Sequence, residues 1–237
     1  MLKLYGFPVS NCVNMVNLAL LEKGLPLDFV LAIPGQSPEF LAKSPRGKVP
    51  CLETEQGFVS EASVILEYLE ESCTGKALLP TDPYHRAQVR ALMKEIELYI
   101  ALPARSCYGE AFFGVTLPDA LKVRARDELV AGFAVLKRHG RFSPFVAGNS
   151  FALADIVFLY SSELGASVGK QFFRARPAWR LACGHGALAA TGRKSERPAA
   201  GCPARCRAAR LHRRHARQNA GRGLNGSCVG TREHDAP

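Results

Sequence analysis

Leu4-Tyr5-Gly6-Phe7-Pro8-Val9-Ser10-Asn11-Cys12 is the stretch that decides the fold of this chain. With the residues just before it, it gives an apolar run from Leu2 to Gly6 that is suited to a buried strand. From its last residue onward, apolar residues recur at helical spacing until Gly24, a natural helix end. These residues are Cys12, Val13, Val16, Leu20 and Leu21. The stretch therefore predicts a strand, a loop and a helix over Asn11 to Lys23.

The following residues continue this alternation of strands and helices. A second strand is expected at about Asp28 to Ile33, and a short helix near Glu39 to Ala42. Val49 to Glu53 and Gly57 to Val59 are typical of a hairpin, after which Ser60 is placed to cap a helix. The pattern predicts an α/β domain over residues 1–74.

The second half of the chain has the periodicity of helices. Residues 75–83 contain Gly75, Pro80 and Pro83 and are expected to form a linker. Three segments with helical spacing follow it. They carry Val89, Leu92, Met93, Ile96, Tyr99 and Ile100; the run from Leu121 to Leu136; and Leu153, Ile156, Val157 and Tyr160. The third segment is apolar enough to be a central buried helix, so we expect a partial all-helical domain over residues 84–173.

The balance of charged residues changes near residue 173. The formal net charge is +10, but residues 1–173 hold 17 Lys+Arg against 18 Asp+Glu, and residues 174–237 hold 14 against 3. The first part therefore gives no sign of a nucleic-acid or acidic-membrane partner. Ala, Arg, Gly and Pro make up 39 of the last 64 residues, too little apolar surface to offset an ordering entropy of ~1–2 kcal/mol per residue. We expect residues 174–237 to be disordered, and their composition suggests a GC-rich gene read in a shifted frame.

The basic tail offers two weak alternative sites. Cys202, Cys206, His212 and His215 lie too close together for a zinc finger, so no metal is expected. Its arginines could bind nucleic acid without sequence preference, but no aromatic run accompanies them. The chain has no secretory apolar region and no run of ~18 apolar residues, which predicts a cytoplasmic protein without a membrane span. Its eight cysteines form no regular framework and are expected to be reduced.

Five motifs, in order and at the right intervals, resemble those of the soluble glutathione transferases, in particular bacterial members of the theta/zeta-like serine type. They are Leu4 to Cys12, Ser44 to Pro50, Ser60 to Glu70, Leu78 to Pro83 and Phe145 to Ile156. The resemblance implies a thioredoxin-like domain with a mixed four-stranded sheet and three helices, followed by a helical bundle. The bundle would be truncated, because the last helices of the family would fall in the tail. It also implies a homodimer.

The implied reaction joins the thiolate of glutathione, the co-substrate, to a hydrophobic electrophile. A thiol with a pKa of ~8.5 is only slightly ionised at neutral pH, so a donor must stabilise the anion. The resemblance assigns this role to Ser10, which could instead be an ordinary N-cap. Cys12 is the rival catalytic residue, because Ser10-x-Cys12 resembles the zeta pattern, although cysteine is often a core residue. Two alternative functions stay open: a glutathione-dependent isomerase or reductase, and a non-catalytic relic.

The resemblance also places the glutathione site. The Val49-Pro50 bond is implied to be cis and to turn the backbone of Val49 toward glutathione, while Lys48 could meet the glycyl carboxylate. Glu61 and Ala62 open a helix whose free N–H groups would bind the γ-glutamyl carboxylate. Ala62 stands where the family has Ser or Thr, a lost hydrogen bond of ~1.5–3 kcal/mol, and Ser63 is expected to point elsewhere.

The electrophile pocket is expected between the domains, beside the segment after Ser10 and lined by Tyr99, Arg105 and Tyr108. Ala152 stands where the family's central helix begins with Ser or Thr. Only the Asp155 half of that capping box is left, so Asp155 is expected to be structural.

Overall fold

The computed structural model describes residues 1–173, leaving out the side chains of residues 170, 171 and 173. Its N-terminal part contains four strands: β1 (Leu2–Gly6), β2 (Leu27–Leu31), β3 (Cys51–Thr54) and β4 (Gly57–Ser60). The sheet order is β2-β1-β3-β4, with β1 parallel to β2 and antiparallel to β3. This is the expected mixed sheet of a thioredoxin-like domain. The expected disorder, shifted frame and weak sites of residues 174–237 lie outside the described residues.

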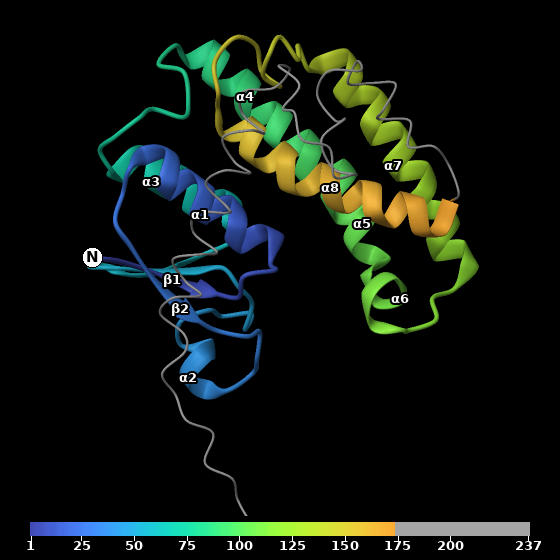
Figure 1. Ribbon diagram of the computed structural model, residues 1–237, viewed down its shortest axis with the longest axis horizontal. Coiled ribbons are helices and arrows are strands. Elements are labelled where there is room, and N and C mark those ends of the chain that lie inside the picture. Colours follow the sequence, from blue (N-terminus) through green and yellow to red (C-terminus); the bar gives the residue numbers. More distant parts are fainter. Residues whose placement is uncertain (174–237) are drawn as a thin grey trace, which may run out of the picture.

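Three helices flank this sheet. Figure 1 shows α1 (Asn11–Lys23) and α3 (Ala62–Ser72) on one side and the short α2 (Pro38–Leu41) on the other. Leu4 and Leu52 of the sheet are fully buried, as are the residues of α1 and α3 that face it. The latter include Val13, Leu20, Ile65, Leu66 and Leu69. Burial of these apolar side chains holds the helices at the positions that the site requires.

Two predicted boundaries need correction. β3 begins at Cys51 rather than Val49, because Pro50 has no N–H to donate to the strand ladder. Ser60 does not cap α3 as predicted: it pairs with Cys51 in the sheet, and Glu61 takes the N-cap position without a side-chain hydrogen bond. The strand therefore runs directly into the helix through the φ of +70° at Glu61.

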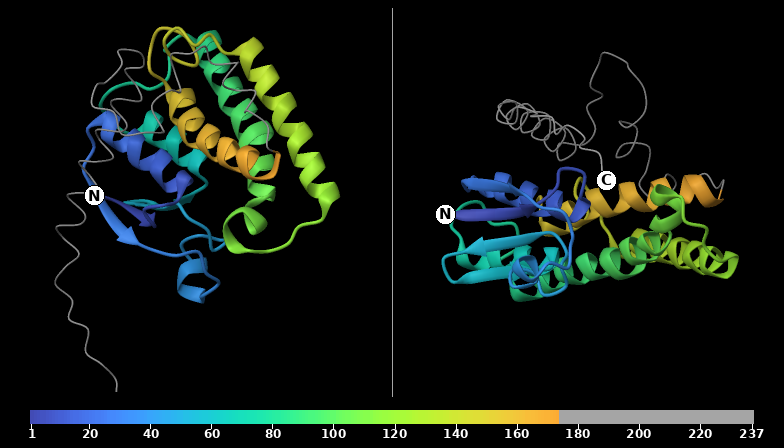
Figure 2. Two further views of the ribbon diagram at one scale, coloured as in Figure 1. Left: turned by 45° about the vertical axis from the view of Figure 1, so that its right-hand side comes forward. Right: turned by 90° about the horizontal axis from the view of Figure 1, so that it is seen from below.

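The C-terminal part is helical and packs beside the sheet domain (Figures 1 and 2). Its elements are α4 (Pro83–Ile96), η1 (Glu97–Ala101), α5 (Leu102–Ser106), α6 (Tyr108–Phe113), α7 (Asp119–His139) and α8 (Leu153–Phe173). α8 contacts α4, η1, α5 and α7, and on another side it contacts α1. Leu153 and Ile156 of α8 are fully buried. α8 is therefore the central helix that its composition predicted.

The first long helix is interrupted, contrary to its apolar spacing. η1 is a π-helical turn in which the N–H of Leu102 bonds to the carbonyl of Glu97. Pro103 follows, and in a regular α-helix its ring would clash with the carbonyl of residue 99; the wider turn avoids this clash. Ile100 stays fully buried, but Tyr99 is 50% exposed. The wider turn therefore changes which side chains of this segment face the sheet domain.

The linker is fixed between the two parts by a buried carboxylate. Glu70 of α3 forms an ion pair with Lys23 of α1 at 2.8 Å, with side-chain exposures of 6% and 2%. The same carboxylate accepts hydrogen bonds from the N–H groups of Leu78 and Leu79. The carbonyl of Leu78 in turn accepts from the N–H of Leu153 at the start of α8. Glu70 thus connects α1, α3, the linker and the central helix.

Candidate functional site

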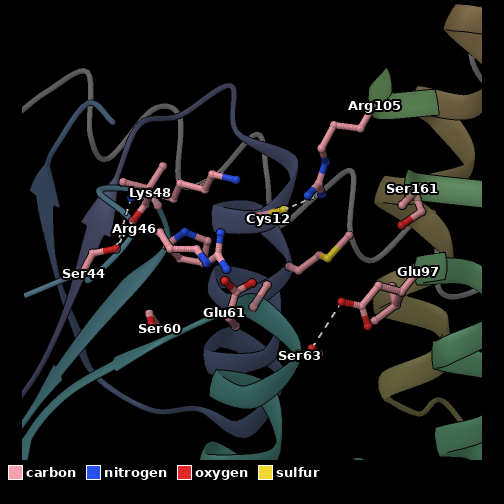
Figure 3. Close-up of a pocket in the computed structure, with 16 residues that line it drawn as sticks. Cys12, Ser44, Arg46, Lys48, Ser60, Glu61, Ser63, Glu97, Arg105 and Ser161 are labelled. Atoms are coloured by element: carbon pink, nitrogen blue, oxygen red, sulfur yellow. Dashed lines mark hydrogen bonds between the residues drawn. The ribbon is translucent and has the colours of Figure 1, made fainter. Parts of the chain in front are cut away.

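A cavity of about 110 Å³ lies between the sheet domain and the helices. One wall consists of the start of α1, the loop before β3 and the start of α3, and the other of η1, α5 and α8 (Figure 3). The predicted site residues that line it are Cys12, Lys48, Val49, Pro50, Glu61, Ala62 and Arg105. Ser10, Tyr99 and Tyr108 were also predicted and are not among the lining residues. The cavity brings together segments that are far apart in the sequence.

The loop before β3 is held by the buried side chain of Ser44. Its hydroxyl donates to the carbonyl of Lys48 at 2.8 Å and accepts from the N–H of Lys48 at 3.1 Å. Gly47 lies at a φ of +61°, where an added Cβ would come within 1.9 Å of the Gly35 carbonyl oxygen. The loop therefore requires glycine there, and it presents Lys48 and the cis Val49-Pro50 bond to the cavity. Arg46 lines the cavity as well and was not predicted.

The start of α3 presents unpaired backbone donors to the same cavity. Glu61, at its N-cap, makes no capping bond, so the N–H groups of the first turn stay available for an anion. Ala62 and Ser63 both line the cavity. The hydroxyl of Ser63 lies 3.5 Å from Oε1 of Glu97 on the helical side of the cavity (Figure 3), so that Ser63 faces Glu97.

Replacing Ala62 by serine should tighten the binding of glutathione, the co-substrate that the family resemblance implies, by up to about tenfold, because the new hydroxyl would add one hydrogen bond to a carboxylate at the start of α3. Isothermal titration calorimetry of wild type and Ala62→Ser measures this change. Ser72→Ala, at the exposed far end of the same helix, is the control and should bind as wild type does. If Ala62→Ser binds glutathione with the same affinity as wild type, Ser63 or another group already donates a hydrogen bond to that carboxylate.

Ser10 is the N-cap of α1. Its Oγ accepts a hydrogen bond from the N–H of Val13 at 3.4 Å, which leaves the hydroxyl hydrogen free to donate to another group. The loop before it is held by Asn14, whose side chain donates to the carbonyl of Pro8 at 2.9 Å. Asn11 donates to the carbonyl of Tyr160 on α8, also at 2.9 Å. The start of α1 is therefore fixed to both parts of the chain.

Cys12 is the reactive side chain that the cavity contains. Its Sγ lies 3.4 Å from Nη2 of Arg105, a contact between residues 93 positions apart (Figure 3). Burial raises the pKa of the Cys12 thiol, and the Arg105 guanidinium acts against that increase. Burial thus keeps Cys12 mainly as the neutral thiol in the free protein, and Arg105 is the group that favours its ionisation.

Alkylation of Cys12 by iodoacetamide should accordingly have its midpoint at a higher pH than alkylation of a free thiol, and Arg105→Gln should move that midpoint higher still. Peptide mass spectrometry across a pH series measures the rate at Cys12 separately from the other cysteines. Arg90→Gln, a change on α4 outside the cavity, is the control. A midpoint at or below that of a free thiol would show that the thiolate is stabilised, and a lower midpoint in Arg105→Gln would contradict the contact.

The three residues that were predicted to line the electrophile pocket lie in different surroundings. Arg105 reaches the cavity, whereas the π turn leaves Tyr99 half exposed and outside the lining. Tyr108 has a buried hydroxyl without a hydrogen-bond partner in residues 1–173. Glu97 and Ser161 line the cavity and were not predicted from the sequence. No local motif marks them, because their positions depend on the π turn and on the packing of α8.

Asp155 has the structural surroundings that the sequence indicated. Its carboxylate accepts from the N–H of Ala152 at 2.9 Å and from that of Val146 at 2.8 Å. Burial raises its pKa to about 6, against the opposing effect of these hydrogen bonds. Asp155 therefore fixes the start of α8 and lies outside the cavity lining.

Comparison with known proteins identifies the family. The model for the glutathione S-transferase N-terminal domain matches residues 4–77. A glutathione S-transferase of Pseudomonas putida is 60% identical over 171 residues, which are 72% of this chain and 78% of that protein. This chain belongs to the glutathione S-transferase family. A zeta-class transferase of Euphorbia esula is 31% identical over 162 residues, 65% of this chain and 72% of its own length.

Solved structures of the family have the same fold. A maleylacetoacetate isomerase of Methylobacterium extorquens, solved with malonate and glutathione, is 26% identical with a TM-score of 0.61, covering 79% of this chain and 92% of its own. A glutathione S-transferase from Pseudomonas fluorescens has a TM-score of 0.61 at 24% identity, with coverages of 78% and 94%. The relatives support a glutathione transferase enzyme with a thioredoxin-like and a helical domain. Within the described residues, no helix is long and apolar enough to span a membrane, and no cluster of three potential metal ligands occurs.

Proposed function

We propose that this transferase conjugates the thiolate of glutathione to a small hydrophobic electrophile. The observation that carries the proposal is a cavity between the sheet domain and the helices that combines backbone donors and cations with apolar side chains. Lys48, the Val49 backbone and the start of α3 offer polar contacts on one wall. Across from them lie apolar side chains of the helical part, Ala101 and Val157. A peptide thiol and an apolar co-substrate would thus meet beside the start of α1.

Glutathione would bind to the sheet-domain wall through its charged ends. The free N–H groups and the dipole at the start of α3 suit the γ-glutamyl carboxylate, and Glu61 beside them suits the γ-glutamyl ammonium. Lys48 suits the glycyl carboxylate, and the backbone of Val49 suits the main chain of the cysteinyl residue. This orientation would bring the sulfur toward the start of α1, where Ser10 and Cys12 lie.

Ser10 would then stabilise the thiolate by donating its free hydroxyl hydrogen to the sulfur. The N–H of Val13 already occupies one lone pair of Oγ, which orients the hydroxyl. One hydrogen bond to an anion is worth ~1.5–3 kcal/mol, or about one to two units of thiol pKa. The positive end of the α1 dipole acts in the same direction.

The contact between Cys12 and Arg105 supports a second candidate, a glutathione-dependent isomerase or reductase. A cysteine that faces the cavity beside a guanidinium could form a mixed disulfide with glutathione, and relatives of the zeta class and a maleylacetoacetate isomerase are similar to this chain. The homodimer and the cytoplasmic location that the family implies stay predictions.

Turnover assays on the purified full chain separate these functions. Conjugation of 1-chloro-2,4-dinitrobenzene, followed by absorbance, is the expected activity, with dehydroascorbate and maleylacetoacetate as the alternative substrates. Glutathione binding by calorimetry is measured in parallel. Turnover of an alternative substrate without conjugation would replace the transferase proposal by the second candidate, and absence of glutathione binding would indicate a non-catalytic relic.

A further inference from the structure

The helical wall of the cavity carries a buried hydroxyl without a partner. Ser161 of α8 is 1% exposed and lines the cavity, and its Oγ has no hydrogen-bond partner among the described residues. Two other serines of α8, Ser162 and Ser167, instead donate to helix carbonyls. A buried unpaired hydroxyl costs about 1–3 kcal/mol. A ligand in the cavity could therefore supply the hydrogen-bond partner that the Ser161 hydroxyl lacks.

The same wall carries a cation that lacks a carboxylate partner. Arg105 extends from α5 toward Cys12 (Figure 3), and none of the ion pairs within residues 1–173 includes it. Its planar guanidinium is suited to a planar anion with two oxygens. The buried hydroxyl of Tyr108, near Arg105, has no hydrogen-bond partner within residues 1–173, but Tyr108 lies outside the cavity lining.

The other charged groups of the cavity have different roles. Arg46 and Lys48 lie on the opposite wall, where the carboxylates of glutathione would bind (Figure 3). Glu97 on the helical wall is paired with Lys94 at 2.7 Å. Arg105 is therefore the cation of the helical wall that an incoming co-substrate can meet, with the apolar side chains of Ala101 and Val157 on the same wall.

We propose that the electrophile is an apolar molecule with a carboxylate, which pairs with the Arg105 guanidinium and accepts a hydrogen bond from the Ser161 hydroxyl. This inference rests on the conjugation proposed above and specifies its co-substrate. Arg105 and Ser161 then determine specificity: they hold the carboxylate while the reactive carbon meets the sulfur beside Cys12.

A pair of chloroarenes tests this inference with the full chain. In 4-chloro-3,5-dinitrobenzoate and the corresponding carboxamide, the sulfur forms a bond to the ring carbon and chloride leaves with the bonding electrons. Each kcat/KM is divided by the spontaneous rate with glutathione, to correct for reactivity. Wild type should prefer the carboxylate by about tenfold or more, the value of one charge-assisted pair. Arg105→Gln should bring this ratio close to one, and Ser161→Ala should reduce it by a smaller factor.

The control is Arg126→Gln, which removes an exposed arginine of α7 that pairs with Asp127. It should keep the wild-type ratio. Equal corrected rates for the two wild-type substrates, or a preference that survives Arg105→Gln, would overturn the inference.

Calorimetry with S-(4-carboxybenzyl)glutathione and S-(4-carbamoylbenzyl)glutathione gives a second readout that needs no turnover. The carboxylate should bind about tenfold more tightly to wild type and lose this advantage in Arg105→Gln. If both ligands bind wild type equally, the inference fails while the glutathione site stands. If neither they nor glutathione bind, the proposed function fails first. Weaker binding of glutathione itself to Arg105→Gln would assign Arg105 to glutathione and also overturn the inference.

Discussion

Ser10→Ala should lower the turnover of glutathione conjugation by about 10- to 100-fold, because it removes the proposed hydrogen bond of ~1.5–3 kcal/mol to the thiolate. Glutathione affinity should change little, since in the proposed orientation the charged ends of the tripeptide bind elsewhere on the wall. The variant also loses the cap of α1, at a cost of ~1 kcal/mol in unfolding free energy. Steady-state kinetics with 1-chloro-2,4-dinitrobenzene, combined with calorimetric titration, separate the two effects.

Ser37→Ala is a matched control for the capping effect. Ser37 caps α2 with the same geometry, its Oγ accepting from the N–H of Phe40 at 3.3 Å, and it does not line the cavity. This variant should keep wild-type turnover. If Ser10→Ala also keeps it while Cys12→Ala abolishes it, Cys12 rather than Ser10 is the catalytic residue.

Glu70→Ala should lower the free energy of unfolding by about 3–5 kcal/mol, the usual loss when one partner of a buried ion pair is removed. Lys23, whose side chain is 2% exposed, would remain as a buried cation without its carboxylate. The N–H groups of Leu78 and Leu79 would lose their acceptor as well. The linker, and with it the helical wall of the cavity, would then be held less firmly. Urea denaturation followed by circular dichroism measures the loss.

Glu71→Ala is the control on the same helix. Glu71 is 65% exposed and lies 3.5 Å from Arg90, a surface pair worth about 0–1 kcal/mol. Glu70→Gln separates charge from hydrogen bonding, because its amide oxygen can still accept from the linker. A Glu70→Ala loss no larger than that of Glu71→Ala would refute the role of Glu70 as the connection between linker and domains.

Local patterns were sufficient for the parts of the site that short segments form. The family resemblance of the run before Pro50 implied the cis bond that the structure has, and Ala62, the residue that departs from the family motif, lies at the start of α3. Asp155 accepts the hydrogen bond from the N–H of Ala152, which is the half of the capping box that the sequence retains. Each of these features lies within one short motif, so that the resemblance of that motif to the family was enough to place it.

Sequence patterns could not predict which side chains lie on the helical wall of the cavity. Apolar spacing grouped Tyr99 with Ile96 and Ile100, but the π turn before Pro103 left Tyr99 exposed. Arg105 meets Cys12 across 93 positions of sequence, and such a contact depends on how two domains pack. The sequence indicated Arg105 only through the family resemblance, and it gave no signal at all for Ser161.

Ultraviolet difference spectroscopy of bound glutathione near 240 nm, where the thiolate absorbs, tests most directly whether this cavity activates glutathione through Ser10. Titration from pH 5 to pH 10 should give wild type an apparent thiol pKa about one to two units below that of free glutathione, and Ser10→Ala a value close to the free one. A thiolate signal that appears in wild type only at the pH of free glutathione, or one that is the same in Ser10→Ala, would contradict the account.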